Sequence, residues 1–218
     1  MSLLTFAQEG TYHTIQDLEA WTSAEISYKP IKKVKITLQQ QLRLKDDASN
    51  VDQYFTQFDL RYKLAKGLYI TPAVRFIRDN DDQGKIQGYE NHLRLQSDLI
   101  YKHDISRWSL QYRARYQTKQ ELQVEDDNIN TFRLKVGAKY NIKNWKFDPK
   151  VGLEFFNRLG TENEWYKLRW TVGTKYSFKS AGDLGFYFRQ EQDLVGAYEK
   201  TTNILFLKYG YTLKNKSK

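Results

Sequence analysis

The sequence predicts an all-β protein: a transmembrane, antiparallel, up-and-down β-barrel of twelve strands, with ten strands as the alternative. The first observation is the segment 108–117, WSLQYRARYQ, in which apolar and aromatic residues alternate without a slip with Ser, Gln and Arg. Successive side chains of a strand point to opposite faces, so one face of this segment suits hydrocarbon and the other suits water or anions. Secondly, the same alternation returns roughly every ten to twenty residues, as it does in membrane barrels. Thirdly, mean hydropathy is low, at −0.75, and no apolar run approaches the roughly 20 residues that a membrane-spanning helix needs.

Eleven segments carry the alternation, each bounded by a turn or a polar loop. In chain order they are 18–28, 34–44, 54–64, 68–76, 90–101, 108–117, 132–140, 145–156, 166–176, 184–190 and 205–213. Pro30 ends the first segment, since proline favours tight turns. Pro72 lies inside the fourth segment, where its missing backbone donor suggests a β-bulge.

The outward face of these segments is apolar in each case. From the first segment to the last, examples are Leu18 and Ile26, Leu38 and Leu42, Phe58 and Leu60, Val74 and Phe76, Leu95 and Leu99, Tyr112 and Tyr116, Leu134 and Val136, Leu153 and Phe155, Leu168 and Val172, and finally Leu205 and Leu207. In the tenth segment Tyr187 and Arg189 take the inward face.

The connections predict the direction and number of the strands. Short turns alternate with long polar loops at 45–52, 78–88 and 118–128, and in outer-membrane barrels short turns face the periplasm while long loops face outward. On that assignment the first segment needs a partner strand before it, within residues 4–15. Bacterial single-chain barrels carry an even number of strands, and closure removes unpaired edges, so eleven visible segments predict twelve strands.

We expect a single domain, because no linker, low-complexity block or change in composition divides the chain. Residues 18–218 form the remainder of the barrel, and residues 1–17 form an N-terminal segment. Residues 3–8, LLTFAQ, are typical of the end of a signal peptide's apolar region and equally of an ordinary first strand. Whether residues 1–7 belong to the mature protein is left open.

Composition excludes several classes of protein. The 16 Tyr, 12 Phe and 5 Trp exceed what a polar soluble domain needs for a core, and interfacial girdles of a barrel would use them. The absence of cysteine rules out disulfides, thiolate metal sites and cysteine nucleophiles. The net charge of +9 follows the strand period instead of forming a stripe, which argues against nucleic-acid binding. A soluble lipocalin-like barrel would place its apolar face inside and would have eight strands.

The candidate site is the inward face, which is rich in bases. The predicted pore-lining residues are Arg43, Arg61, Arg75, Arg94, Arg113, Arg115, Arg133, Lys135, Lys139, Arg169, Lys175 and Arg189. Rings of Arg and Lys within a low-dielectric wall select anions, so the interior predicts an anion path. The five bases Arg113, Arg115, Arg133, Lys135 and Lys139 lie on two consecutive segments without an inward carboxylate. Glu19, Glu25 or Glu154 could still neutralise them from across the lumen, so a closed, salt-bridged interior remains the alternative.

Other chemistry has weaker support. A membrane-embedded lipid hydrolase would need a histidine beside a nucleophile, and of the three histidines His92 faces inward while His13 and His103 fall in a terminus and a turn. We therefore assign no catalytic residue. The histidines lack the spacing of a metal site, and the acidic loops lack the glycine and spacing of a calcium loop, so we expect no metal and no cofactor.

The segments also resemble a known family. The resemblance rests on Glu90, Leu93 and Arg94 in ENHLRLQ, on Tyr112, Arg113 and Arg115 in YRARY, and on residues 154–157 followed by Leu168, Arg169, Gly173 and Tyr176 in the region of KLRWTVGTKY. From residue 21 onward the chain is similar to the uncharacterised outer-membrane β-barrel proteins of domain of unknown function 2490, common in the Bacteroidota. That resemblance implies a fold and a location but no activity. In size and basic interior the chain is more distantly similar to small oligosaccharide-specific porins.

The sequence thus predicts a protein of the bacterial outer membrane, surrounded by its lipid, that acts as a small porin or passive channel. Its basic lumen would prefer anions, and small anionic solutes or acidic oligosaccharides are the expected partners. The alternatives are a closed structural or partner-binding barrel and, less favoured, a lipid hydrolase. The solute and the oligomeric state are left open.

Overall fold

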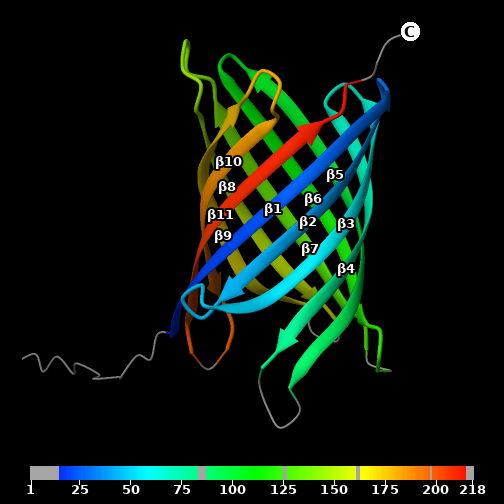
Figure 1. Cartoon of the computed structure of the whole chain (residues 1–218), viewed down its shortest axis with the longest axis vertical. Helices are drawn as coiled ribbons and strands as arrows, with labels where there is room; N and C mark the ends of the chain where they lie inside the picture. Colours follow the sequence, from blue (N-terminus) through cyan, green and yellow to red (C-terminus); the bar gives the residue numbers. More distant parts are fainter. Residues whose placement is uncertain (1–14, 83–86, 125–126, 161–162, 197, 215–218) are drawn as a thin grey trace, which may run out of the picture.

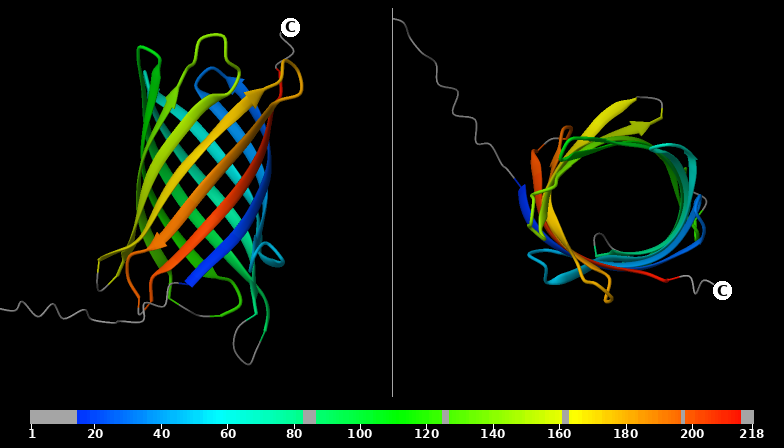
Figure 2. Two further views of the ribbon diagram at one scale, coloured as in Figure 1. Left: turned by 90° about the vertical axis from the view of Figure 1, so that its left-hand side faces the viewer. Right: turned by 90° about the horizontal axis from the view of Figure 1, so that it is seen from above.

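The chain forms a closed β-barrel of eleven strands in a computed structural model that describes residues 15–82, 87–124, 127–160, 163–196 and 198–214 (Figure 1). The strands are β1 (Ile15–Ile31), β2 (Val34–Lys45), β3 (Asn50–Ala65), β4 (Leu68–Asp81), β5 (Gly88–Ile105), β6 (Trp108–Glu121), β7 (Ile129–Tyr140), β8 (Asp148–Leu159), β9 (Glu164–Ser177), β10 (Asp183–Asp193) and β11 (Lys200–Thr212). They tilt around a single ring, as the two views in Figure 2 show. No helix in the described ranges is long and apolar enough to cross a membrane.

The barrel closes through a parallel pair, which differs from the expected all-antiparallel sheet of twelve strands. Each strand pairs antiparallel with the next along the chain, but β1 pairs parallel with β11, from Ile15 opposite Lys200 to Ser27 opposite Thr212. A parallel pair satisfies the backbone hydrogen bonds of the two edge strands as an antiparallel pair does. The barrel can therefore close with an odd number of strands. Residues 4–14, which hold most of the expected additional strand, lie outside the described residues, and Ile15 begins β1.

Because the number of strands is odd, the start of β1 and the end of β11 lie at opposite ends of the barrel. The C-terminal end of β11 lies with the connections 32–33, 66–67, 106–107, 141–147 and 178–182, which we call the turn end (top of Figure 1). The start of β1 lies with the connections 46–49, 82–87, 122–128, 160–163 and 194–199, which we call the loop end.

Several strands extend further into the expected loops than the sequence indicated. Asp79 belongs to β4 and Lys119 to β6, although both fall in expected loops, and their side chains form an ion pair of 2.7 Å. Polar residues can continue a ladder because the backbone makes its hydrogen bonds and the side chains pair with each other. The eighth strand instead lies later in the chain than expected, beginning at Asp148 and not at Trp145 and continuing to Leu159.

Pro72 does not cause the expected bulge. On the β5 side it lies opposite Ser97 without a change of register. On the β3 side the pairing stops after Asp59 opposite Ala73 and resumes, in the same register, at Tyr62 opposite Ile70. Proline lacks the backbone donor for one ladder bond, so it interrupts pairing on one side only. The register shift of this strand pair lies instead between Lys63 and Ala65 of β3.

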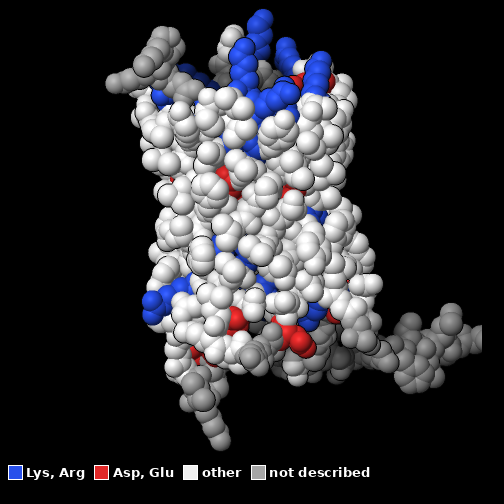
Figure 3. Space-filling view, turned by 90° about the vertical axis from the view of Figure 1, so that its right-hand side faces the viewer, with Lys and Arg blue, Asp and Glu red and all other residues white. Residues whose placement is uncertain are grey.

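The two faces of the wall follow the predicted alternation. On the outside, Leu38, Phe76 and Val136 are each exposed by 50% or more of their surface. Figure 3 shows a band of predominantly uncharged surface between two charged ends. On the inside, most of the wall is polar. A small apolar cluster of Trp21, Ile204 and Phe206 lies where β1 pairs with β11 and closes the barrel.

Candidate functional site: the basic interior

The interior holds two adjoining cavities. The first, of about 610 Å³, is lined by thirteen Lys and Arg side chains and seven Asp and Glu side chains. The second, of about 1150 Å³, is lined by eight Lys and Arg side chains and by Asp104 as its one described carboxylate. Both cavities touch Gln111, Lys135 and Arg189, so they meet along the barrel interior. Because the second cavity includes the turn residues Lys66 and Gly67, it lies toward the turn end.

Eleven of the twelve predicted pore-lining residues line these cavities. The first cavity is lined by Arg43, Arg61, Arg75, Arg94, Arg113, Arg115, Arg133, Lys135, Arg169 and Arg189, and the second also by Lys139. Lys175 lines neither cavity and forms an ion pair of 2.6 Å with Asp183 where β9 and β10 meet the turn end. Lys175 lies near the end of its strand, away from both cavities. The alternation of side chains predicts which face of the wall a residue takes but not its position along the barrel axis.

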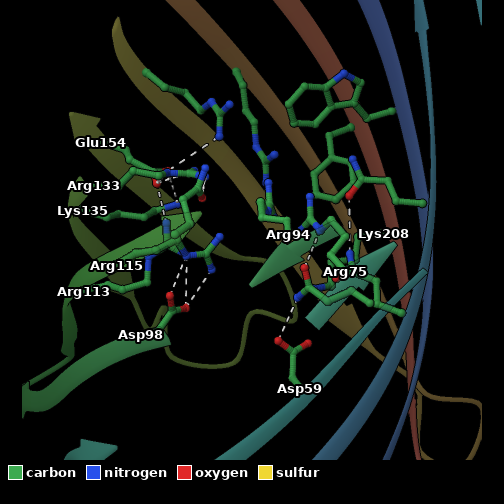
Figure 4. Close-up of a pocket in the computed structure, with 18 of the residues that line it drawn as sticks. Asp59, Arg75, Arg94, Asp98, Arg113, Arg115, Arg133, Lys135, Glu154 and Lys208 are labelled. Atoms are coloured by element: carbon green, nitrogen blue, oxygen red, sulfur yellow. Dashed lines mark hydrogen bonds and ion pairs between the residues drawn. The ribbon is translucent and has the colours of Figure 1, made fainter. Parts of the chain in front are cut away.

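Glu154 on β8 is the centre of the interior network. Its side chain is 2% exposed, and its Oε1 lies 2.5 Å from Nη2 of Arg113 and 2.5 Å from Nη2 of Arg133 (Figure 4). Lys135, opposite Glu154 in the β7–β8 register, and Arg169 on β9 place their nitrogens 3.8 and 3.7 Å from Oε2. A carboxylate this deeply buried is stable as an ion only where charged donors surround it, and four bases do so here.

A second carboxylate pairs with bases of the predicted patch on β6. Asp98 on β5 lies opposite Arg115 and accepts two hydrogen bonds from it, from Nε at 2.5 Å and from Nη2 at 2.8 Å. Arg113 also lies 3.9 Å from Asp98. The patch on β6 and β7 is therefore neutralised in part, but by carboxylates from the flanking strands β5 and β8 and not from across the lumen. Of the three glutamates considered from the sequence, only Glu154 takes part.

The other two glutamates have separate partners. Glu19 accepts a hydrogen bond of 2.6 Å from the Trp21 indole, and Glu25 pairs with Lys208 at 2.8 Å. A third buried carboxylate, Glu191 on β10, pairs with Arg169 and with Lys167, the latter at 3.0 Å.

Several arginines lie on aromatic rings instead of pairing with carboxylates. The guanidinium carbon of Arg43 lies 3.8 Å from the centroid of the Trp21 ring, and that of Arg75 lies 3.5 Å from the Phe55 centroid. Such contacts stabilise a cation by roughly 0.5 to 2 kcal/mol, the higher values when it is desolvated. These aromatic residues occupy inward positions, where the strand pattern predicts polar residues. That departure from the pattern is the feature of the sequence that could have indicated aromatic contacts inside the barrel. Part of the aromatic content therefore lies inside the barrel and not in girdles.

The two ends of the barrel carry opposite charge. Among the described connections, those of the turn end contain Lys32, Lys33, Lys66, Arg107, Lys143, Lys146 and Lys179 and no carboxylate, whereas those of the loop end contain Asp46, Asp47, Asp82, Asp127 and Glu199 and no base. Figure 3 shows the basic residues gathered at the top, which is the turn end. At the loop end, a hydrogen bond from Lys45 lowers the pKa of Asp82 below its usual value.

The two described histidines contact carboxylates and aromatic rings. His92 Nε2 lies 3.1 Å from Asp79 and 3.3 Å from Glu90, and the His103 ring stacks with Tyr101 and Tyr112. His13 lies outside the described residues. Within the described ranges, no group of three or more His, Asp and Glu side chains is placed to hold a metal ion.

Comparison with known proteins identifies a family and assigns no activity. No curated protein and no solved structure matches the sequence. A family model described as "Protein of unknown function (DUF2490)" matches residues 18–197, which is most of the barrel from β1 to the end of β10. The chain therefore belongs to the DUF2490 family.

Proposed function

We propose that this protein is an outer-membrane β-barrel that acts as a small passive channel with a basic, anion-preferring lumen. The observation that carries the membrane assignment is the polarity of the wall. Large apolar side chains such as Leu38, Phe76 and Val136 face outward at 50% exposure or more, while arginines such as Arg94 and Arg133 lie inside at 8%. A water-soluble barrel has the opposite arrangement, and a contiguous apolar belt of this extent suits lipid.

The charge balance of the interior supports the preference for anions. Bases outnumber carboxylates by thirteen to seven in the first cavity and by eight to one in the second. Seven of the eight bases that line the second cavity are lysines, and the ion-paired carboxylates Glu154, Asp98 and Glu191 all line the first cavity. A low-dielectric wall strengthens the field of the unneutralised bases, so that they attract anions and repel cations.

Conductance measurement on the purified protein in a planar lipid bilayer tests this proposal. Under a potassium chloride gradient the reversal potential should have the sign of anion selectivity. Exchange of the second-cavity lysines Lys63, Lys102 and Lys150 together for Gln should move it toward zero. Exchange of Lys32, Lys33 and Lys179 for Gln removes the same charge from the turns and should move it less.

The triple change of Arg113, Arg115 and Arg133 to Gln is less suitable as a test. Those arginines hold Asp98 and Glu154, so their removal would leave the buried Asp98 without a described base and Glu154 with only the more distant Lys135 and Arg169. The triple change would therefore destabilise the fold as well as alter selectivity.

A closed barrel with a structural or partner-binding role is the second candidate function. It is favoured by the network around Glu154, in which four bases from β6, β7 and β9 converge on one carboxylate and fill part of the lumen. Absence of conductance in protein that is demonstrably folded would reject the channel and support this candidate. A lipid hydrolase is the least favoured candidate, and hydrolysis of phospholipid by the purified protein would be needed to support it.

A further inference from the structure

Two interior arginines face each other without a counterion. Arg75 on β4 and Arg94 on β5 lie directly opposite in the strand register, and both line the first cavity with exposures of 7% and 8%. Figure 4 shows them beside each other, apart from the Asp98 and Glu154 network. Like charges directly opposite on one face of a sheet destabilise it, and burial increases the effect.

Neighbouring strands supply no carboxylate at this level of the wall. Across the sheet, the row through these arginines reads Gln57, Arg75, Arg94 and Lys119, and the Lys119 amine is already paired with Asp79 at 2.7 Å. Among the described residues no carboxylate oxygen lies within 4.0 Å of either guanidinium, whereas Arg113, Arg115 and Arg133 each have one.

The free donors of Arg94 form one edge of its guanidinium. Its Nε and Nη2 are buried and have no hydrogen-bond partner. The same two atoms of Arg115 hold the two oxygens of Asp98 at 2.5 and 2.8 Å, so within this barrel that edge is the one that receives an oxyanion. In Arg75, Nε donates to Gln57 at 2.6 Å and the ring of Phe55 supports one face of the guanidinium, which fixes its orientation. The two arginines are thus preorganised to receive an anion that the described residues do not provide.

We propose that Arg75 and Arg94 form a binding site for a tetrahedral dianionic oxyanion, namely a phosphate or sulfate group. Two unpaired cations match a charge of about −2, which phosphate approaches at pH 7. Two oxygens of such a group satisfy the Nε and Nη2 edge of Arg94, and the others remain for Arg75, since guanidinium forks match this geometry. The site does not require an open channel, so it goes beyond the proposed function and would persist in a closed barrel.

Calorimetric titration of inorganic phosphate into the detergent-solubilised protein, at fixed ionic strength in potassium chloride, tests the site. We expect saturable binding of one phosphate per barrel. Binding should weaken at least tenfold in Arg75→Gln and in Arg94→Gln, and Arg94→Lys should also weaken it, because lysine keeps the charge but not the fork. Lys102→Gln, which removes one charge from the second cavity, should leave it unchanged and serves as the matched control.

Stability and an independent ligand make the test decisive. In chloride buffer, Arg94→Gln should unfold at the same temperature as the wild type or higher, because it removes an unpaired buried charge. Phosphate should raise the unfolding temperature of the wild type and of Lys102→Gln but not that of Arg94→Gln. Sulfate should compete with phosphate and acetate should not. Absence of saturable binding, an equal loss in Lys102→Gln, or acetate binding as tight as phosphate would each overturn the assignment. Phosphate binding without conductance would reject the channel alone, and conductance without phosphate binding would reject this site alone.

Discussion

The change Glu154→Gln should be among the most destabilising single substitutions in the barrel. It keeps the shape of the side chain but removes the negative charge around which the nitrogens of Arg113, Arg133, Lys135 and Arg169 lie within 4.0 Å. The carboxylate is 2% exposed, so water cannot replace it. Arg133 and Lys135 would then have no described carboxylate within 4.0 Å, while Arg113 and Arg169 would keep only Asp98 and Glu191. Cations left buried in this way are the costly outcome of a broken buried ion pair.

The magnitude follows from the two closest contacts, each of 2.5 Å between Glu154 Oε1 and an arginine Nη2. With an effective dielectric constant of about 20, a charge pair near 4 Å between centres contributes roughly 4 kcal/mol, so the two pairs together contribute about 8 kcal/mol. Desolvation of the carboxylate offsets several kcal/mol of this. We expect a net loss of about 3 to 5 kcal/mol in the free energy of unfolding.

Urea unfolding of the protein in lipid vesicles, followed by tryptophan fluorescence, measures this loss. Glu25→Gln is the matched control, because Glu25 pairs only with Lys208 and the two side chains are 20% and 33% exposed, so we expect a loss of about 1 kcal/mol or less. A double-mutant cycle with Arg133→Gln should give a coupling energy of about 1 to 3 kcal/mol. If Glu154→Gln and Glu25→Gln cost the same within error, the interior network does not stabilise the barrel and our reasoning fails.

Three other predictions test the wall, its packing and its orientation. Val136→Arg should cost roughly 2 to 4 kcal/mol of unfolding free energy if that position lies near the bilayer midplane, and Lys135→Gln should cost much less. Equal costs would show that the assignment of these residues to lipid and lumen is wrong. Gly173→Ala should lower the unfolding free energy by about 1 to 3 kcal/mol, because a methyl group there would collide with an inward tyrosine ring, and an unchanged value would refute that packing. Because the sequence contains no cysteine, a single introduced cysteine can be labelled specifically in intact cells. Asp127→Cys at the loop end should react with a membrane-impermeant maleimide, and Lys66→Cys at the turn end should not. Reaction of Lys66→Cys but not of Asp127→Cys would mean that the barrel has the opposite orientation in the membrane.

The sequence alone determined which face each residue takes. Val136 lies outside and Lys135 inside because successive side chains of a strand must point to opposite faces, and this rule is local. For the same reason the eleven strand segments and the basic interior could be predicted from the alternation and the charge, whereas the twelfth strand inferred from them is not part of the described barrel. Strand ends were less accurate, since a polar residue such as Asp79 can extend a strand when another strand supplies its partner.

Only the tertiary structure decided which side chains meet. The parallel pairing of β1 with β11 joins segments nearly a whole chain apart, and no local pattern encodes it. The register of β7 on β8 brings Glu154 to Lys135, and the register of β4 on β5 leaves Arg75 facing Arg94 with no acid between them. A shift of two residues would preserve every inward and outward assignment and yet change every ion pair. The alternation therefore determines that the interior is basic, while strand register determines which of its charges are neutralised.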